Sequence, residues 1–190
     1  MPYELIVVGC SWGGLAALGR LLGHLPEEVD LPIAIAQHRS PESPRGGLER
    51  ALGRDLARPV LEAGDKDPIE RGHVYVAPTD YHLLVERGSF ALSVDEHVRH
   101  ARPSIDVLFE SAADAYGAEL IGVVLTGANA DGADGLARIV ERGGVAIVQD
   151  PETAEAREMP EAALAAAPAT VLPLERIGPH VAELCAVGVS

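Results

Sequence analysis

The chain has 190 residues, enough for one domain with a substantial core, and we expect a single domain over residues 1–190. Apolar residues make up 47% of the chain but aromatic ones only 4%, so Ala, Val, Leu and Ile must build the core. A formal net charge of −14 argues against nucleic acids and anionic membranes as partners. Two cysteines without a C-x-x-C pattern, no signal peptide and no apolar run of membrane-spanning length predict a cytoplasmic protein.

Buried strands alternate with amphipathic helices along the chain. Strands are predicted at 4–8, 31–37, 58–63, 73–77, 120–126, 145–149 and 170–172. Helices are predicted after Ser11, at 44–53, from Ser104 to about Tyr116, between 132 and 143, from Pro160 onward and at 177–187. Two runs at 83–86 and 90–94 predict a β-hairpin, and 95–102 predicts a loop. This order indicates an α/β fold, a doubly wound and mostly parallel sheet with helices on both faces and an antiparallel hairpin.

Apolar spacing also predicts which side chains of these helices face the core. Leu15, Leu18, Leu21 and Leu22 share one side of the first helix. The other side chains expected inside are Leu48, Ala51, Leu52, Val107, Leu108, Ala112, Ala115, Leu136, Ile139 and Val140.

The first strand runs into Gly9-Cys10-Ser11-Trp12-Gly13, a G-x-S-x-G pattern between a strand and a helix. This is the context of a nucleophile elbow, which exposes a serine beside the free N–H groups of a helix N-terminus. Two other interpretations stay open from the turn alone. Ser11 could cap the helix, or Gly9 and Gly14 could belong to a dinucleotide-binding loop. The second of these is weakened because Ser11 takes the place of the middle glycine and no acidic residue ends the second strand.

Three chemically useful side chains follow buried strands, namely Ser11, His38 and Asp131. Ligands of open α/β sheets bind at the carboxyl ends of the strands, so these side chains could form a nucleophile, base and orienting carboxylate. Their order along the chain differs from that of α/β-hydrolases. His82 is the next candidate for the base, and Asp131 could instead cap the following helix.

Metal sites are not predicted. His97 and His100 are three residues apart but have no third ligand at a suitable spacing. The loop that begins at Gly127 does not fit calcium, because Arg138 falls where a bidentate glutamate belongs.

Taken together, the motifs resemble the catalytic domain of CheB-type chemotaxis protein-glutamate methylesterases. The resemblance covers nearly the whole chain. Its landmarks are 8–14 around Ser11, 36–38, 72–78, 102–109, 124–127, Asp131-Gly132, Gln149-Asp150 and Met159-Pro160.

The resemblance implies a catalytic triad of Ser11, His38 and Asp131 on a doubly wound α/β sheet. The implied reaction is hydrolysis of glutamate γ-methyl esters on the signalling helices of chemoreceptors, or of a related methylated protein, with release of methanol. Deamidation of receptor glutamines is a further implied activity. The resemblance implies no metal and no organic cofactor.

The chain departs from the family pattern beside two of these residues. Cys10 and Trp12 flank the serine where the family has a small residue and a threonine, and Ala128 and Asn129 replace the family's Met and Gly. Backbone N–H groups of Trp12 and of the loop near Ala128 are the expected oxyanion donors, so these replacements should affect substrate fit more than chemistry. Asn129 tolerates a left-handed backbone and can replace the glycine.

We expect a catalytic domain that stands alone, without the receiver domain common in the family, and therefore activity that a phosphodonor does not change. Two alternatives remain. The first is a serine esterase or amidase with another target, and the second is a regulatory module that keeps the fold but only binds a partner.

Overall fold

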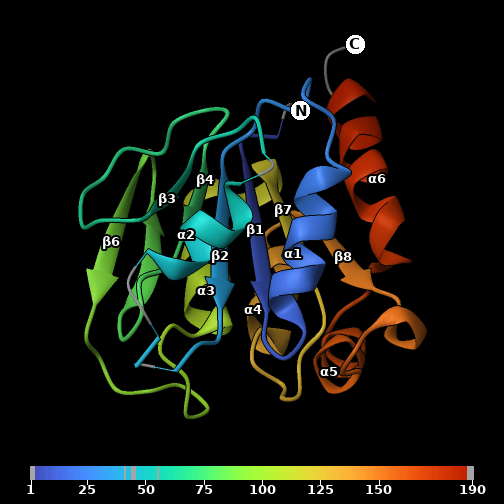
Figure 1. The fold of residues 1–190 in the computed structure, drawn as a ribbon. Helices are drawn as coiled ribbons and strands as arrows, with labels where there is room; N and C mark the ends of the chain where they lie inside the picture. The colour runs from blue at the N-terminus through green and yellow to red at the C-terminus, as the bar shows by residue number, and fades with distance from the viewer. Residues whose placement is uncertain (1–2, 41, 44–45, 55, 188–190) are drawn as a thin grey trace.

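A seven-stranded parallel sheet forms the centre of the computed structural model, which describes residues 3–40, 42–43, 46–54 and 56–187 (Figure 1). The strands are β1 (Leu5–Cys10), β2 (Ile33–Gln37), β3 (Val60–Glu62), β4 (Val74–Val76), β7 (Leu120–Val124), β8 (Val145–Gln149) and β9 (Thr170–Leu172). Their order across the sheet is β3-β4-β2-β1-β7-β8-β9. The predicted hairpin, β5 (His82–Glu86) and β6 (Ser89–Ser93), forms a separate antiparallel pair.

Helices cover both faces of this sheet, which confirms the predicted fold class. One apolar cluster joins the sheet to α1 (Gly14–Gly23), α2 (Gly47–Leu52) and α6 (Leu174–Val187). The other joins it to α3 (Ile105–Tyr116), α4 (Ala133–Glu141), α5 (Glu158–Ala166) and the hairpin. Short 3-10 turns, η1 (Gly117–Glu119) and η2 (Pro151–Thr153), follow α3 and β8.

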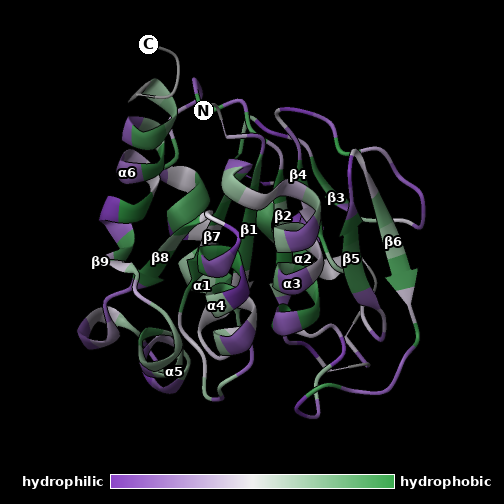
Figure 2. Cartoon of the chain, turned by 180° about the vertical axis from the view of Figure 1, so that it is seen from behind, coloured by the Kyte–Doolittle hydropathy of each residue, from purple (hydrophilic) through white to green (hydrophobic). Residues whose placement is uncertain are grey.

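The central strands contribute to both apolar clusters. In β1, Leu5 and Val7 belong to the cluster of α3, whereas Ile6 and Val8 belong to the cluster of α1. This is why the strand is apolar at successive positions instead of alternating. Figure 2 shows the same sheet from behind, with hydrophobic colouring on the central strands and hydrophilic patches on the outer helices. No helix within the described residues is both long and apolar enough to span a bilayer.

Some predicted inward side chains lie elsewhere. The buried stripe of α1 runs through Gly14, Ala17, Leu18, Leu21 and Leu22, and Leu15, one position off this stripe, is 46% exposed.

The other differences occur where a helix has an unusual set of neighbours. Ala51 is exposed on the short helix α2. Helix α3 packs against the sheet, α4 and β5 at once, so Ile105, Phe109 and Ala113 are fully buried, whereas Val107 and Ala115 are half-buried. Val140 is half-buried too.

Helix boundaries differ by a few residues from those predicted. The last helix begins at Leu174 instead of 177, and α5 begins at Glu158, two residues before the proline expected to open it. Residues 44 and 45, where the second helix was expected to begin, lie outside the described residues. None of these shifts moves the ends of the central strands, which set the position of the candidate site.

Candidate active site

The three candidate side chains follow three neighbouring parallel strands. Ser11 follows β1, His38 follows β2, and Asp131 lies in the loop between β7 and α4. β1 pairs with β2 on one side and with β7 on the other, so their carboxyl ends share one edge of the sheet. The N–H of Ser11 donates to the carbonyl of Thr126 at 3.0 Å, and that of His38 donates to the carbonyl of Cys10 at 3.1 Å. The site therefore lies where α/β sheets usually bind ligands.

A tight turn presents Ser11 at the end of β1. Gly13 has a left-handed backbone with φ 75°, and a side chain there would also meet Glu155. A methyl group at Gly9 would collide with the side chain of Ile105. Both glycines of the G-x-S-x-G pattern are thus required by the local geometry, as a nucleophile elbow predicts.

Asp131 is fully buried and anchors His38. Its Oδ2 lies 2.6 Å from Nε2 of His38, whose side chain is 12% exposed. The same carboxylate accepts three further hydrogen bonds at the start of α3, from Ser104 Oγ at 2.8 Å, Ile105 N at 2.7 Å and Asp106 N at 3.1 Å. Four donors therefore converge on one carboxylate at a helix N-terminus, where negative charge is stabilised.

Burial raises the pKa of Asp131, but the hydrogen bonds from His38, Ile105 and Asp106 outweigh it and hold this pKa below the usual value of an aspartate. The carboxylate is therefore ionised at neutral pH. An ionised carboxylate on one ring nitrogen can fix the orientation of an imidazole and stabilise its protonated form.

The contacts of Asn129 identify the tautomer of His38. Asn129 Oδ1 accepts the N–H of Asp131 at 3.0 Å, so its amide nitrogen must be the atom that lies 3.1 Å from Nδ1 of His38. Nδ1 therefore accepts a hydrogen bond, and Nε2 carries the proton that is donated to Asp131. Nδ1 is thus the basic nitrogen of the ring, and in this structure the Asn129 amide occupies its lone pair.

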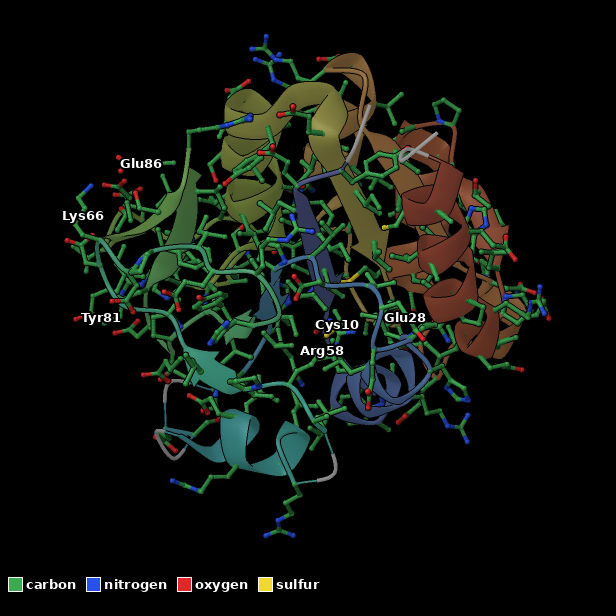
Figure 3. The ribbon with its side chains drawn as sticks, turned by 90° about the horizontal axis from the view of Figure 1, so that it is seen from above. Cys10, Glu28, Arg58, Lys66, Tyr81 and Glu86 are labelled. Atoms are coloured by element: carbon green, nitrogen blue, oxygen red, sulfur yellow. The ribbon has the colours of Figure 1, made fainter. Side chains whose placement is uncertain are left out.

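Ser11 lies at a cavity of about 360 Å³, which His38 and Asn129 also line. Within the described residues, no hydrogen bond joins Ser11 Oγ to His38. The neighbouring Cys10 is fully buried, and burial raises the pKa of its thiol, so it cannot act as the nucleophile. Figure 3, seen from above, shows Cys10 in the interior, whereas Lys66 and Glu86 form an ion pair at the edge of the molecule.

A sequence model of the CheB methylesterase family matches residues 6–181, almost the whole chain. The chain belongs to this family.

Similar proteins agree with this assignment. The chain is 49% identical over 179 residues to a Leptospira interrogans protein named "Putative protein-glutamate methylesterase/protein-glutamine glutaminase", and the match covers 93% of this chain and 92% of that one. It is 42% identical to the protein-glutamate methylesterase FrzG of Myxococcus xanthus over 93% of this chain but only 53% of FrzG, so it spans about half the length of that relative. The catalytic domain of Thermotoga maritima CheB methylesterase has the same fold, with a TM-score of 0.90, 31% identity and coverage of 97% and 100% of the two chains.

Two of the four departures from the CheB pattern, Trp12 and Ala128, lie at the outer rim of the site, whereas Cys10 is buried and Asn129 contacts His38. Trp12 is 66% exposed, Ala128 is exposed, and neither lines the cavity in front of Ser11. Within the described residues, neither of their backbone N–H groups donates a hydrogen bond. Both groups are therefore available to a ligand, as the expected oxyanion donors must be.

The capping alternatives for the site residues are wrong. Gly13 is the N-cap of α1 and Gly132 is the N-cap of α4, and neither Ser11 nor Asp131 gives a side-chain cap to these helices. Asp131 contacts the start of α3 instead of the helix that follows it. His82 is 1% exposed and uses both ring nitrogens, with Nδ1 accepting from Ser104 N and Nε2 donating to Glu96 O. His82 is therefore a buried histidine whose hydrogen-bonding groups both have partners, as is usual for buried polar groups.

Several residues that sequence reasoning did not include support the site. Ser104 was predicted only as a helix cap, and it also binds Asp131. Asp106 accepts the N–H groups of Gly132 and Gly135 at 2.9 and 2.8 Å. The hydroxyl of Thr126 contacts the carbonyl of Trp12 at 2.9 Å, and so fixes the turn that carries Ser11. Within the described residues, no group of three or more His, Cys, Asp or Glu side chains is arranged to hold a metal ion.

Proposed function

We propose that this protein is a protein-glutamate methylesterase that uses Ser11 as nucleophile, His38 as base and Asp131 as orienting carboxylate, within one domain over residues 1–190. The contact between His38 and Asp131 carries the proposal. It pairs a buried, ionised carboxylate with an imidazole whose basic nitrogen contacts Asn129, and His38 and Asn129 line the same cavity as Ser11. Membership of the CheB methylesterase family and relatives named protein-glutamate methylesterase support the choice of reaction.

In the proposed reaction, Ser11 Oγ attacks the γ-carbonyl carbon of a glutamate methyl ester and Nδ1 of His38 takes the hydroxyl proton. The N–H groups of Trp12 and Ala128 stabilise the negative oxygen of the tetrahedral intermediate. His38 then protonates the departing methanol, which leaves an acyl-enzyme on Ser11. A water molecule, deprotonated by the same ring nitrogen, releases the free glutamate.

The substrate that fits this proposal is a methylated chemoreceptor or a related methylated protein. The names of relatives such as the Leptospira interrogans protein add protein-glutamine glutaminase activity, which would use the same steps with ammonia as leaving group. The triad requires neither a metal nor an organic cofactor at any of these steps. The exposed Trp12 at the rim is the observation that favours the alternative, a serine esterase or amidase with another target.

Methanol release tests the proposal. A chemoreceptor cytoplasmic fragment carrying tritiated γ-methyl esters is incubated with the protein, and volatile methanol is counted. We expect release by the unmodified protein, none above background from Ser11→Ala, and full release from the control Ser89→Ala in the hairpin. Methanol release from a folded Ser11→Ala protein would refute the assignment of Ser11 as the nucleophile.

A fluorophosphonate probe separates the remaining alternatives. Labelling of Ser11 without methanol release would favour an esterase or amidase with a different target. A folded protein whose Ser11 is inert to the probe would favour a module that only binds its partner.

A further inference from the structure

The cavity beside Ser11 is cationic although the protein is strongly acidic. The chain has 29 acidic residues and 15 Lys and Arg, but none of the acidic residues that the structure describes lines this cavity. Three of the described arginines line it, namely Arg39, Arg99 and Arg102. A cleft with charge of one sign attracts ligands of the opposite sign even when the net charge of the protein is unfavourable.

Two of these arginines are already paired with carboxylates outside the cavity. Arg99 contacts Asp106 at 3.3 Å and Asp134 at 2.6 Å. Arg102 contacts Asp80 at 2.6 Å, and its Nη1 donates to two backbone carbonyls at 2.8 and 2.9 Å. These contacts hold the loop before α3 in place at one side of the cavity. They also leave little of the positive charge of Arg99 and Arg102 for a ligand.

Arg39 differs because no described carboxylate lies within ion-pair distance of it. Its Nη2 donates to the carbonyl of Ala77 at 2.7 Å, and its Nε is buried without a hydrogen-bond partner. Nη1 has no partner among the described residues. A half-buried guanidinium held by one carbonyl retains most of its positive charge and a free donor.

The position of Arg39 connects this charge to catalysis. It follows His38 directly in the sequence, and both side chains line the same cavity as Ser11. The carbonyl contact with Ala77, the residue after β4, anchors the guanidinium on the neighbouring strand end. A ligand whose ester carbon sits at Ser11 therefore brings its adjacent groups to Arg39.

We propose that Arg39 is a specificity-determining residue that binds a carboxylate next to the scissile ester, so that the site selects acidic polypeptide segments. The identity of the ester rests on the proposed function, whereas the preference for acidic segments does not. A guanidinium–carboxylate contact of this kind gives about tenfold in affinity.

Binding of two peptides to full-length Ser11→Ala protein tests the proposal. Both peptides carry one central glutamate γ-methyl ester and a fluorescent label, and they differ only in having Glu or the uncharged Gln at the flanking positions. Fluorescence anisotropy gives the two dissociation constants. We expect about tenfold tighter binding of the acidic peptide, despite the formal net charge of −14 on the protein.

Variants at the same position assign this preference to Arg39. Adding Arg39→Gln should remove the preference, and Arg39→Lys should keep part of it, because Lys retains the charge but not the planar pair of donors. Arg20→Gln, an exposed arginine on α1, is the matched control and should keep the full preference.

The outcomes are distinct. Equal binding of the two peptides, or a preference that survives in folded Arg39→Gln protein, would overturn the proposal. The first comparison needs no variant of Arg39, so it decides even where Arg39→Gln fails to fold. Methanol release from the acidic peptide by the unmodified protein is measured in parallel. A preference for the acidic peptide without methanol release would refute the proposed methylesterase activity, whereas the proposed role of Arg39 would remain supported.

Discussion

The two sides of the His38 ring are built in different ways. On the Nε2 side, Asp131 is fully buried and receives four hydrogen bonds, three of them from the start of α3. On the Nδ1 side, the Asn129 amide is the single described hydrogen-bond partner, and a cavity of about 360 Å³ lies beyond.

This difference shows which part of the site is organised before substrate arrives. The ring orientation and the proton on Nε2 are fixed by buried groups that gain nothing from a ligand. In the proposed mechanism, the nucleophile side is completed only when Ser11 Oγ reaches Nδ1, and for that the Asn129 amide has to move.

Removing the ring that both sides share should have the largest effect. We expect His38→Ala to lower kcat by about 10⁶-fold on a γ-methyl ester, as loss of the base does in serine hydrolases. The control is His82→Ala, which removes a buried histidine outside the site and should cost stability but not the rate per folded molecule. Loss of activity in folded His82→Ala protein with activity retained in His38→Ala would make the assignment wrong.

Breaking the buried side should have the next largest effect. Asp131→Ala should lower kcat by about 10⁴-fold, less than loss of His38, because the ring remains but loses its orientation and charge partner. It should also cost about 1–3 kcal/mol of stability, since Ile105 N and Asp106 N lose their acceptor.

The control Ser104→Ala removes one of the four donors to Asp131 together with the side-chain cap of α3, and it should have a much smaller effect on kcat. Steady-state kinetics and urea unfolding measure the two quantities separately. Equal loss of kcat in both variants would mean that the hydrogen-bond network, and not the carboxylate, supports His38.

The same contrast explains what the sequence could predict. Ser11, His38 and Asp131 each follow a long apolar strand, so parallel pairing alone brings them to one edge of the sheet. The partners of Asp131 on α3 are 25–27 residues away in the chain, and no local pattern links them.

The arginines that line the cavity could not be predicted for a related reason. Arg99 and Arg102 lie in a loop without periodicity, and the backbone path of that loop decides which cavity they line. Leu15 shows the limit of periodicity itself, because a leucine one position off the buried stripe fits the apolar pattern yet is exposed.

On the open side, removing the Asn129 amide should increase activity. Asn129→Ala frees the lone pair of His38 Nδ1, so we expect kcat/KM for a small activated ester to rise by about 2–10-fold, the value of one hydrogen bond. Ala130→Gly, a change of one methyl group in the same loop, controls for loop flexibility. The ¹⁵N chemical shift of His38 Nδ1 should change only in Asn129→Ala. A fall in kcat/KM would show that Asn129 positions the ring instead of blocking it.

The smallest expected effect concerns Asp106, whose carboxylate holds the backbone that follows Asp131. Its Oδ1 accepts the N–H groups of Gly132 and Gly135, and its Oδ2 lies 3.3 Å from Arg99. Burial, with a contribution from the neighbouring Asp131, raises the pKa of Asp106 to about 6 against the opposing hydrogen bond from Gly135. The folded state therefore binds this proton more tightly than the unfolded state does.

The free energy of unfolding contributed by Asp106 should thus decrease as pH rises from about 4 to 6. Asp106→Asn keeps an acceptor for the two N–H groups but cannot titrate, so its stability relative to the unmodified protein should increase over that pH range, on the order of 1 kcal/mol. Urea unfolding at pH 4, 5, 6 and 7 measures the difference, with Asp134→Asn as control for the loss of a carboxylate beside Arg99. The pKa of Asp131 is lowered, so the stability that its charged form contributes is lost only on acidification below this pH range. A pH-independent difference between Asp106→Asn and the unmodified protein would show that Asp106 does not titrate there, and that only hydrogen bonding joins it to the buried side.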